Sequence, residues 1–246
     1  MMIVISLASP ITYEQKSPNN RKGRDLVIAL DSSGSMGESG FDNEKKDIRK
    51  FDTVVAILND FIDKRYDDNI GIVLFGTFAF ASAPLTYDTT ALKYVLQFLD
   101  VGLAGENTAI GEGINQSLRV LQNGDASKKV VILLSDGFTN SGSISAKNAV
   151  IKAKKEKVKI YTIGLGKDGD FDEKLLKLIA KDSNGKFFKA KNASQLQEIY
   201  IEINSLEPSP IRSQHYLHKK ILFFIPLFIA ISLLIFMLLR RVGLKK

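Results

Sequence analysis

Short apolar runs alternate along most of this chain with longer segments in which apolar residues recur every three or four positions. The runs at 24–30, 69–75, 129–134 and 157–163 have the length and composition of buried strands. Between the first two runs, Ile48, Phe51, Val55, Leu58 and Ile62 follow helical spacing. Strands that alternate with helices predict an α/β fold, with a mostly parallel sheet, right-handed crossovers and helices on both faces.

The same pattern predicts the remaining elements, after a linker at 36–43. They are strands over 77–81 and 186–189, and helices near 90–99, 109–121, 145–156, 172–181 and 194–206. About 180 residues is ample for a single core. No internal repeat is evident.

Small polar residues follow two of the buried runs. Asp31, Ser33 and Ser35 come after the first strand, Asp136 comes after the strand at 129–134, and Thr108 lies in a third polar stretch. The carboxyl ends of parallel strands converge on one edge of an α/β sheet, where such folds bind ligands. Carboxylate and hydroxyl oxygens suit Mg²⁺. The first segment by itself is also typical of an ordinary Ser/Gly-rich turn, and the second carboxylate favours the metal site.

These segments carry a family resemblance. The sequences DSSGSM at 31–36, TAIG at 108–111 and LLSDG at 133–137 resemble the metal-ion-dependent adhesion site of von Willebrand factor A domains, and the resemblance covers about 24–206. It implies a three-layer, doubly wound, mostly parallel sheet with one Mg²⁺, or alternatively Mn²⁺, at its top. The direct or water-mediated ligands that it implies are Asp31, Ser33, Ser35, Thr108 and Asp136. One departure is Asn107, which stands where family members usually have glycine.

Within this family, the chain most resembles the bacterial aerotolerance (Bat-type) proteins, on the segments 75–80, 83–88 and 161–166. In that group, helices at the ends of the A domain hold it beside a membrane. The resemblance therefore implies a location at the bacterial inner membrane.

An apolar stretch near the end of the chain fits this expectation. Residues 221–239 are 19 residues without a charge, which span roughly 28 Å as a helix, close to the hydrocarbon thickness of a bilayer. We predict a transmembrane helix here that contacts the lipid bilayer, kinked at Pro226, between a juxtamembrane linker at 207–220 and a basic tail at 240–246. A buried core helix is the alternative. More cations follow the stretch than precede it, so the positive-inside rule places the A domain outside the cytoplasm.

The start of the chain provides no convincing export signal. Residues 1–8 are apolar but lack a positive n-region and are too short to span a bilayer. The resemblance implies that 1–23 is an apolar stub and a linker, and that the stub is the end of an upstream membrane helix.

Charge and composition exclude several functions. The net charge is +7, but seven of the 34 basic residues and none of the 27 acidic ones lie after residue 207, so the remainder is formally neutral. The basic excess therefore indicates a membrane anchor, and no nucleic-acid partner is expected. The two histidines, His215 and His218, lie in the predicted linker, and cysteine is absent. A Ser-His-Asp hydrolase, a thiol nucleophile and a zinc finger are thus excluded.

We therefore interpret the chain as a non-enzymatic, membrane-anchored A domain that binds a protein partner through Mg²⁺. Hydroxyl-rich ligation neutralises the ion only in part, so an acidic residue of a partner completes its coordination, or Glu38 or Glu106 does so internally. Two alternatives stay open. One is a Mg²⁺-dependent phosphohydrolase with Asp31 as nucleophile and Lys45, Lys46 or Arg49 as the cation. The other is a scaffold with a structural metal.

Overall fold

The computed structural model describes residues 11–13, 23–65, 68–207, 219–221 and 224–243. The chain divides into two compact units. The larger, Lys22–Arg212, contains the candidate site, and the smaller combines Met1–Arg21 with Ser213–Lys246.

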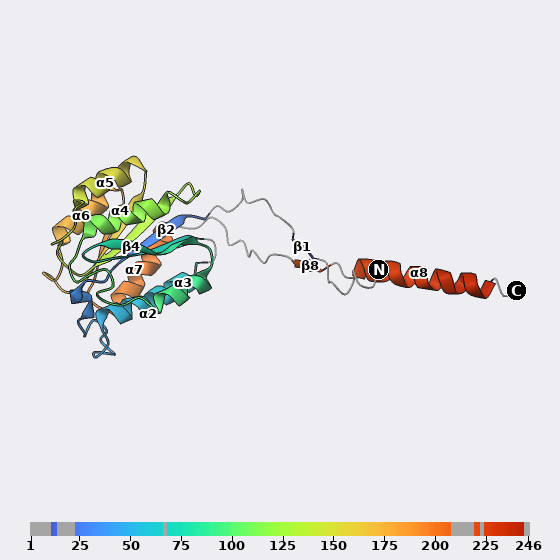
Figure 1. Ribbon diagram of the computed structural model, residues 1–246. Coiled ribbons are helices and arrows are strands. Elements are labelled where there is room, and N and C mark those ends of the chain that lie inside the picture. Colours follow the sequence, from blue (N-terminus) through green and yellow to red (C-terminus); the bar gives the residue numbers. More distant parts are fainter. Residues whose placement is uncertain (1–10, 14–22, 66–67, 208–218, 222–223, 244–246) are drawn as a thin grey trace. The chain divides into compact units, whose positions relative to one another are not determined.

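A six-stranded mixed sheet forms the centre of the larger unit (Figure 1). In spatial order its strands are β4 (Ala79–Thr86), β3 (Asn69–Phe75), β2 (Asp25–Asp31), β5 (Lys129–Ser135), β6 (Lys159–Leu165) and β7 (Phe187–Ala190). All neighbouring strands are parallel except β3 and β4. This arrangement agrees with the α/β fold expected from the sequence.

Helices cover both faces of the sheet, because the side chains of each buried strand alternate between two cores. Leu26, Ile28 and Leu30 of β2 pack in one core with α2 (Lys50–Asp63), α3 (Thr89–Leu96) and α7 (Ala193–Leu206). Val27 and Ala29 pack in the other, with α4 (Ile110–Leu121), α5 (Ala146–Lys155) and α6 (Glu173–Asp182). Each of these five β2 side chains is at most 1% exposed.

The strand order places β2 at the point where the direction of winding reverses. The chain leaves β2 for β3 on one side, and later returns to β5 on the other side. In open α/β sheets such a reversal leaves a crevice at the carboxyl ends of the strands. The residues after β2 and after β5 lie at this crevice.

The loops at this edge pack backbone against backbone. A Cβ atom added to Gly76, directly after β3, would lie 2.3 Å from the carbonyl oxygen of Gly105. Gly105 itself has a positive φ of 87°, which glycine adopts without strain. These glycines therefore allow an approach that no side chain would permit.

Three local details differ from the sequence-based expectation. The first long helix begins at Lys50, so Ile48 lies outside it and is 36% exposed. Arg49 has an extended backbone and forms an antiparallel bridge with Ser39, which delays the helix. The expected linker contains part of a 3₁₀ helix, η2 (Gly34–Gly37), and β4 continues to Thr86, well beyond residue 81.

The described residues of the smaller unit form two short strands and a helix. Strand β1 (Ile11–Tyr13) pairs antiparallel with β8 (Lys219–Ile221), and α8 (Phe224–Gly243) follows.

The predicted transmembrane helix at 221–239 is wrong for this structure. Among the described residues, no helix combines the length and the apolar character needed to cross a bilayer. Residue 221 belongs to a strand, and α8 reaches Arg240 after about 16 uncharged residues, which span roughly 24 Å, whereas a spanning helix needs about 20 residues. Most of the predicted linker at 207–220, including both histidines, lies outside the described residues, as do 1–10, 14–22 and 244–246 of the predicted N-terminal segment and basic tail.

Candidate metal centre

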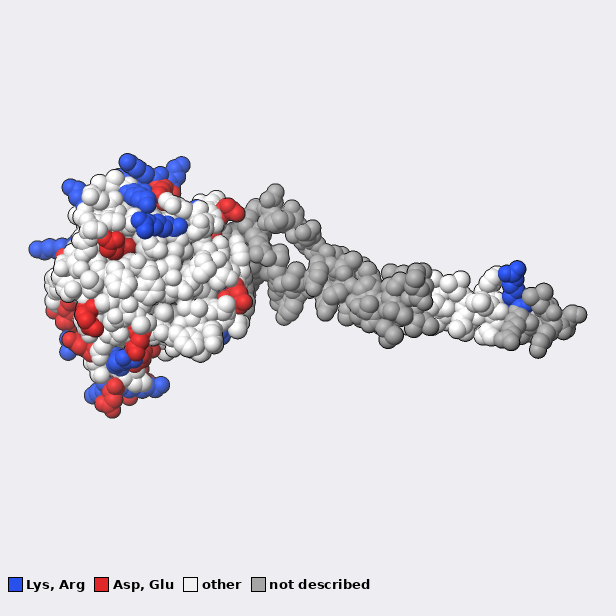
Figure 2. Space-filling model, viewed as in Figure 1, with Lys and Arg blue, Asp and Glu red and all other residues white. Residues whose placement is uncertain are grey.

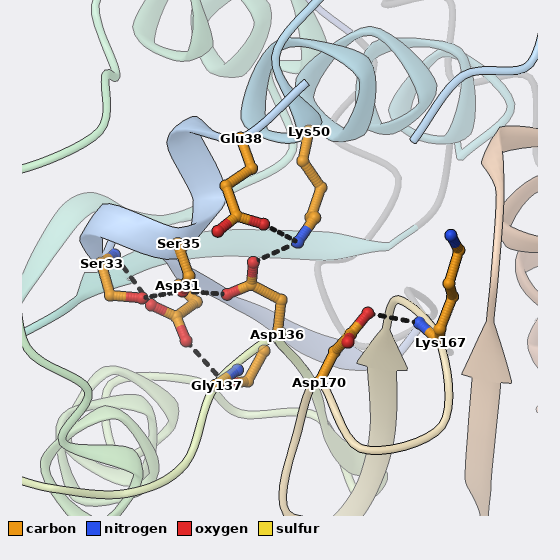
Figure 3. A network of polar contacts seen from close by, with 10 residues as sticks. Asp31, Ser33, Ser35, Glu38, Lys50, Asp136, Gly137, Lys167 and Asp170 are labelled. Carbon is orange, nitrogen blue, oxygen red and sulfur yellow. Dashed lines mark hydrogen bonds and ion pairs between the residues drawn. The ribbon is translucent and has the colours of Figure 1, made fainter. Parts of the chain in front are cut away.

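Two neighbouring parallel strands bring the two predicted carboxylates to the same edge. Asp31 is the last residue of β2, and Asp136 directly follows β5, which pairs with β2. Both residues are buried, at 0% and 2% exposed. Figure 3 shows their carboxylates close to each other, below the 3₁₀ turn of η2. The sheet register therefore concentrates negative charge at one buried point.

Asp31 is held by neutral donors. The backbone N–H of Ser33 donates to its Oδ1 at 2.9 Å, and the Ser135 hydroxyl donates to its Oδ2 at 2.6 Å. Among the described residues, no basic side chain forms an ion pair with Asp31. Burial raises the pKa of Asp31 to about 7, and the charge of Asp136 adds to this rise, although the hydrogen bonds from Ser135 and Ser33 oppose it. The carboxylate form of Asp31 is thus under-compensated, as expected for a group whose cation is supplied from outside.

The two serine hydroxyls connect the carboxylates. Ser35 Oγ donates to Asp136 Oδ1 at 2.7 Å, and Ser33 Oγ lies 3.3 Å from Ser35 Oγ. Gly34 separates the serines, and its backbone N–H donates to the carbonyl of Glu106 at 3.0 Å. The loop before α4 therefore fixes the turn that presents both hydroxyls.

Thr108 reaches the same cluster from the loop before α4. A Cβ atom added to Gly137 would lie 3.0 Å from Thr108 Oγ1 and 3.7 Å from Ser35 Oγ. The Thr108 backbone is held on both sides, because its N–H donates to Asn140 Oδ1 at 2.8 Å and its carbonyl accepts from the Thr139 hydroxyl at 3.2 Å. All five predicted ligand residues are thus brought together.

Lys50 is a charged group at this site that the sequence analysis did not identify. Its Nζ donates to Asp136 Oδ2 at 2.5 Å, and the side chain is 8% exposed (Figure 3). The cations considered from the sequence, Lys45, Lys46 and Arg49, play no such part, since Arg49 instead pairs with Asp52 and Asp100 at 2.8 Å each. A lysine in the first turn of a helix opposes the helix dipole. This unfavourable position was the feature of the sequence that could have drawn attention to Lys50.

Two glutamates border the cluster. Glu38 Oε2 lies 4.0 Å from Lys50 Nζ. The Glu106 carboxylate lies against the turn, with its Oε2 2.8 Å from where a Gly34 Cβ would be. The residue after it, Asn107, has an exposed side chain and donates its backbone N–H to Thr77 Oγ1 at 3.2 Å.

The donor set fits a hard divalent cation. It contains two carboxylates and three hydroxyls, all oxygen, which is the ligand type of Mg²⁺ and Mn²⁺. Within the described residues there is no group of three or more His, Cys, Asp or Glu suited to a metal, so hydroxyls are essential to any such site here. The buried Asp31, which lacks a cationic partner among those residues, is the observation that supports the fit.

Charges elsewhere on the larger unit are mixed. On the face shown in Figure 2, basic and acidic side chains lie near one another along the rim, around a largely uncharged middle.

Comparison with known families identifies the fold. The von Willebrand factor type A domain model matches residues 25–202, and the chain belongs to this family. An uncharacterized protein of Borreliella burgdorferi is 31% identical over 199 residues, which cover 81% of this chain and 57% of that protein. The chain thus spans little more than half the length of that relative.

Solved structures agree with this assignment. BatB of Bacteroides thetaiotaomicron has a TM-score of 0.64 at 23% identity, covering 75% of this chain and 98% of its own. An aerotolerance-related membrane protein of Bacteroides fragilis gives 0.63 at 21%, covering 75% and 100%. Mussel byssus proximal thread matrix protein 1, with a zinc-occupied MIDAS motif, gives 0.62 at 24%, covering 83% and 49%. At these identities the likeness shows the fold. The predicted membership of the A-domain family is confirmed, and the structural neighbours include two proteins of the aerotolerance type.

Proposed function

We propose that this A domain binds a protein partner through a divalent cation, Mg²⁺ in the first place, held by Asp31, Ser33, Ser35, Thr108 and Asp136. The observation that supports this best is the buried Asp31 carboxylate, whose hydrogen-bond donors among the described residues are neutral hydroxyl and backbone N–H groups. A cation bound to it would remove the cost of burying an uncompensated charge.

The chemistry of the ligands favours binding over catalysis. Neutral hydroxyls leave much of the charge of a divalent ion uncompensated, so the ion attracts a further anionic oxygen. A carboxylate of a partner protein supplies that oxygen. Asp31 is poorly placed as a nucleophile, because it is 0% exposed and both of its oxygens accept hydrogen bonds. These points support a binding role over the phosphohydrolase alternative.

Exposed apolar side chains flank the candidate site. Phe78 and Phe138 are each 53% exposed and Leu103 is 46% exposed. Phe138 lies two residues after Asp136, and the Phe78 backbone N–H donates to the carbonyl of Ala104, next to Leu103. An acidic residue on a protein surface, with apolar neighbours, would contact both the cation and this rim. Large apolar groups around a central polar contact are typical of protein interfaces.

The metal site is tested by calorimetry on the full chain. We expect wild-type protein to bind Mg²⁺ or Mn²⁺, and Asp31→Ala to lose the binding, with an affinity at least about 100-fold weaker. Asp60→Ala, which removes an exposed carboxylate, is the matched control and should bind as wild type does. Equal binding by wild type and Asp31→Ala would refute the site.

Partner binding is tested by affinity capture from membranes of the source cell, with Mg²⁺ and with chelator. The same protein should be captured only with Mg²⁺, and Phe138→Ser should reduce its recovery without changing Mg²⁺ affinity. Capture that is indifferent to chelator would favour a scaffold with a structural metal. Mg²⁺-dependent phosphate release that Asp31→Asn abolishes would favour the phosphohydrolase.

We further propose that the domain acts in a bacterial envelope complex, outside the cytoplasm. The support is the likeness to an aerotolerance-related protein that is described as a membrane protein. Recovery of the native chain with the cytosolic fraction of washed, lysed cells would contradict this.

A further inference from the structure

The candidate metal site contains its own cation. Lys50 Nζ lies 2.5 Å from Asp136 Oδ2 and 4.0 Å from Glu38 Oε2, and the lysine side chain is 8% exposed. We propose that this ammonium is a resident counter-charge that lowers the affinity of the site for a divalent cation and makes the bound cation depend on an external carboxylate. The inference rests on the proposed metal site and concerns its regulation.

The position of Lys50 is unfavourable for the helix that bears it. Lys50 is the first residue of α2, and the preceding residue, Arg49, is also cationic. The N-terminus of a helix carries partial positive charge and favours acidic side chains. Burying the lysine side chain adds a desolvation cost. Both costs are offset at one place, the ion pair with Asp136.

The backbone fixes the lysine in that position. Its N–H donates to the carbonyl of Glu38 at 2.7 Å, which ties the start of α2 to the end of the η2 turn. The same turn contains Ser35, whose hydroxyl donates to the other oxygen of Asp136. Asp136 is therefore oriented from both sides, with Oδ2 toward Lys50 and Oδ1 toward Ser35.

The charges of the site follow from these contacts. Among the buried groups, with both carboxylates ionised, Asp31, Asp136 and Lys50 sum to one negative charge. Glu38 is left out of this sum because it is 73% exposed and 4.0 Å from Lys50 Nζ, where solvent screens its charge. A divalent cation would bring the sum to one positive charge, which one carboxylate of a partner neutralises. Without Lys50, the loaded site would already be neutral and would attract an acidic ligand less strongly. Lys50 thereby shifts binding energy from the metal toward the partner.

A purely structural role for the ion pair makes a different prediction. If Lys50 only anchored α2 to the sheet edge, its removal would destabilise the protein and would leave metal affinity unchanged or reduced. If Lys50 is a counter-charge, its removal destabilises the metal-free protein and tightens metal binding, because an unpaired Asp136 and a cation then attract each other without competition.

The experiment compares Lys50→Met, Lys50→Gln and Lys50→Arg in the full chain, with Lys46→Met as the matched control. Lys46 is exposed, so its substitution removes the same charge without touching Asp136. Mg²⁺ affinity is measured by calorimetry, and the thermal midpoint is measured in chelator and in saturating Mg²⁺. Lys50→Gln keeps a polar side chain and supplies the neutral variant if Lys50→Met does not fold.

We expect the neutral variants to bind Mg²⁺ at least about tenfold more tightly than wild type, with a lower thermal midpoint in chelator and a larger rise on adding Mg²⁺. Lys50→Arg and Lys46→Met should stay close to wild-type affinity. Neutral variants that bind Mg²⁺ no better than wild type would overturn the counter-charge. Wild type that binds no divalent cation would overturn the metal site first, and this inference with it.

Discussion

The two ends of strand β2 bury polar groups in opposite ways. At its start, Arg24 forms a two-pronged ion pair with Asp68 at 3.1–3.2 Å, and Arg65 also pairs with Asp68 at 2.7 Å. Asp25 accepts from Asn69 at 2.9 Å and from the backbone of Ala126 at 3.0 Å. At the other end, the donors that the described part of the chain offers to Asp31 are all neutral.

We interpret the cluster at the start of β2 as a contribution to stability and the cluster at its end as the candidate functional site. Both clusters are almost fully buried, so burial alone does not distinguish them. The first meets its acids with arginines and amides from its own fold. The second combines two carboxylates with one lysine and three hydroxyls, and under the proposed function an added cation completes it.

The largest effect is expected at the start of β2, where Asp68 pairs with Arg24 and Arg65. Asp68→Asn leaves two buried arginines without their common acid, and it should lower the free energy of unfolding by about 3–5 kcal/mol. Urea denaturation checks this. Asp63→Asn removes an exposed acid from its pair with Lys93, and should cost about 1 kcal/mol or less. The Asp68→Asn loss should be the same with and without Mg²⁺, and a loss that Mg²⁺ restores would contradict the division of roles.

An intermediate effect compares two acids of the same strand. In chelator at pH 7.5, Asp25→Asn should destabilise the protein by about 1–3 kcal/mol, because the hydrogen bonds of a buried acid are disturbed. Asp31→Asn should instead be neutral or stabilising by about 1–3 kcal/mol, because an amide replaces an under-compensated buried carboxylate. Equal losses in the two variants, measured by urea denaturation, would contradict the contrast.

The smallest expected effect concerns Glu207, which accepts hydrogen bonds from Lys159 and from Tyr161, the latter at 2.9 Å. Burial tends to raise the pKa of Glu207, but these bonds outweigh it and keep the pKa below its ordinary value. A lowered acid pKa stabilises the fold above the unfolded pKa of about 4.3, and this stability is lost as pH falls through the folded pKa.

Glu207→Gln should therefore cost about 1 kcal/mol at pH 7 and nothing at a pH below the folded pKa. Thermal midpoints measured from pH 7 down to pH 3 check the sign. A variant curve that runs parallel to wild type over this range would show that the charge of Glu207 does not matter.

Local patterns were enough to predict most of the sheet and the contributors to the site. Asp31 and Asp136 were predictable because each ends a buried apolar run, and parallel strands bring such ends together. Lys50 was missed because nothing local relates it to Asp136, 86 positions away. Ser135 was noted in its segment, but its bond to Asp31 depends on strand register, which sequence pattern does not specify.

At the C-terminal helix, the sequence pattern predicted a feature that the structure does not contain. A continuous apolar run from 221 predicted a spanning helix, but the structure assigns residue 221 to β8 and starts the helix at Phe224. Hydropathy measures apolar length, whereas the point at which a helix begins depends on competing strand pairing. The length of strand β4 was mispredicted for a similar reason, since it depends on antiparallel pairing with β3, which is a tertiary contact.

The backbone contact between Gly76 and Gly105 has a consequence for protein engineering. Because these loops touch through main-chain atoms, their frame tolerates no side chain at the two glycines, while Phe78, Leu103 and Phe138 project from it into solvent. The loops at this edge thus combine two glycine positions that accept no other residue with three exposed apolar positions that can be substituted. If the proposed function holds, a library that randomises only these three residues would change partner preference while leaving the candidate cation site intact, because binding residues on loops vary independently of a rigid scaffold.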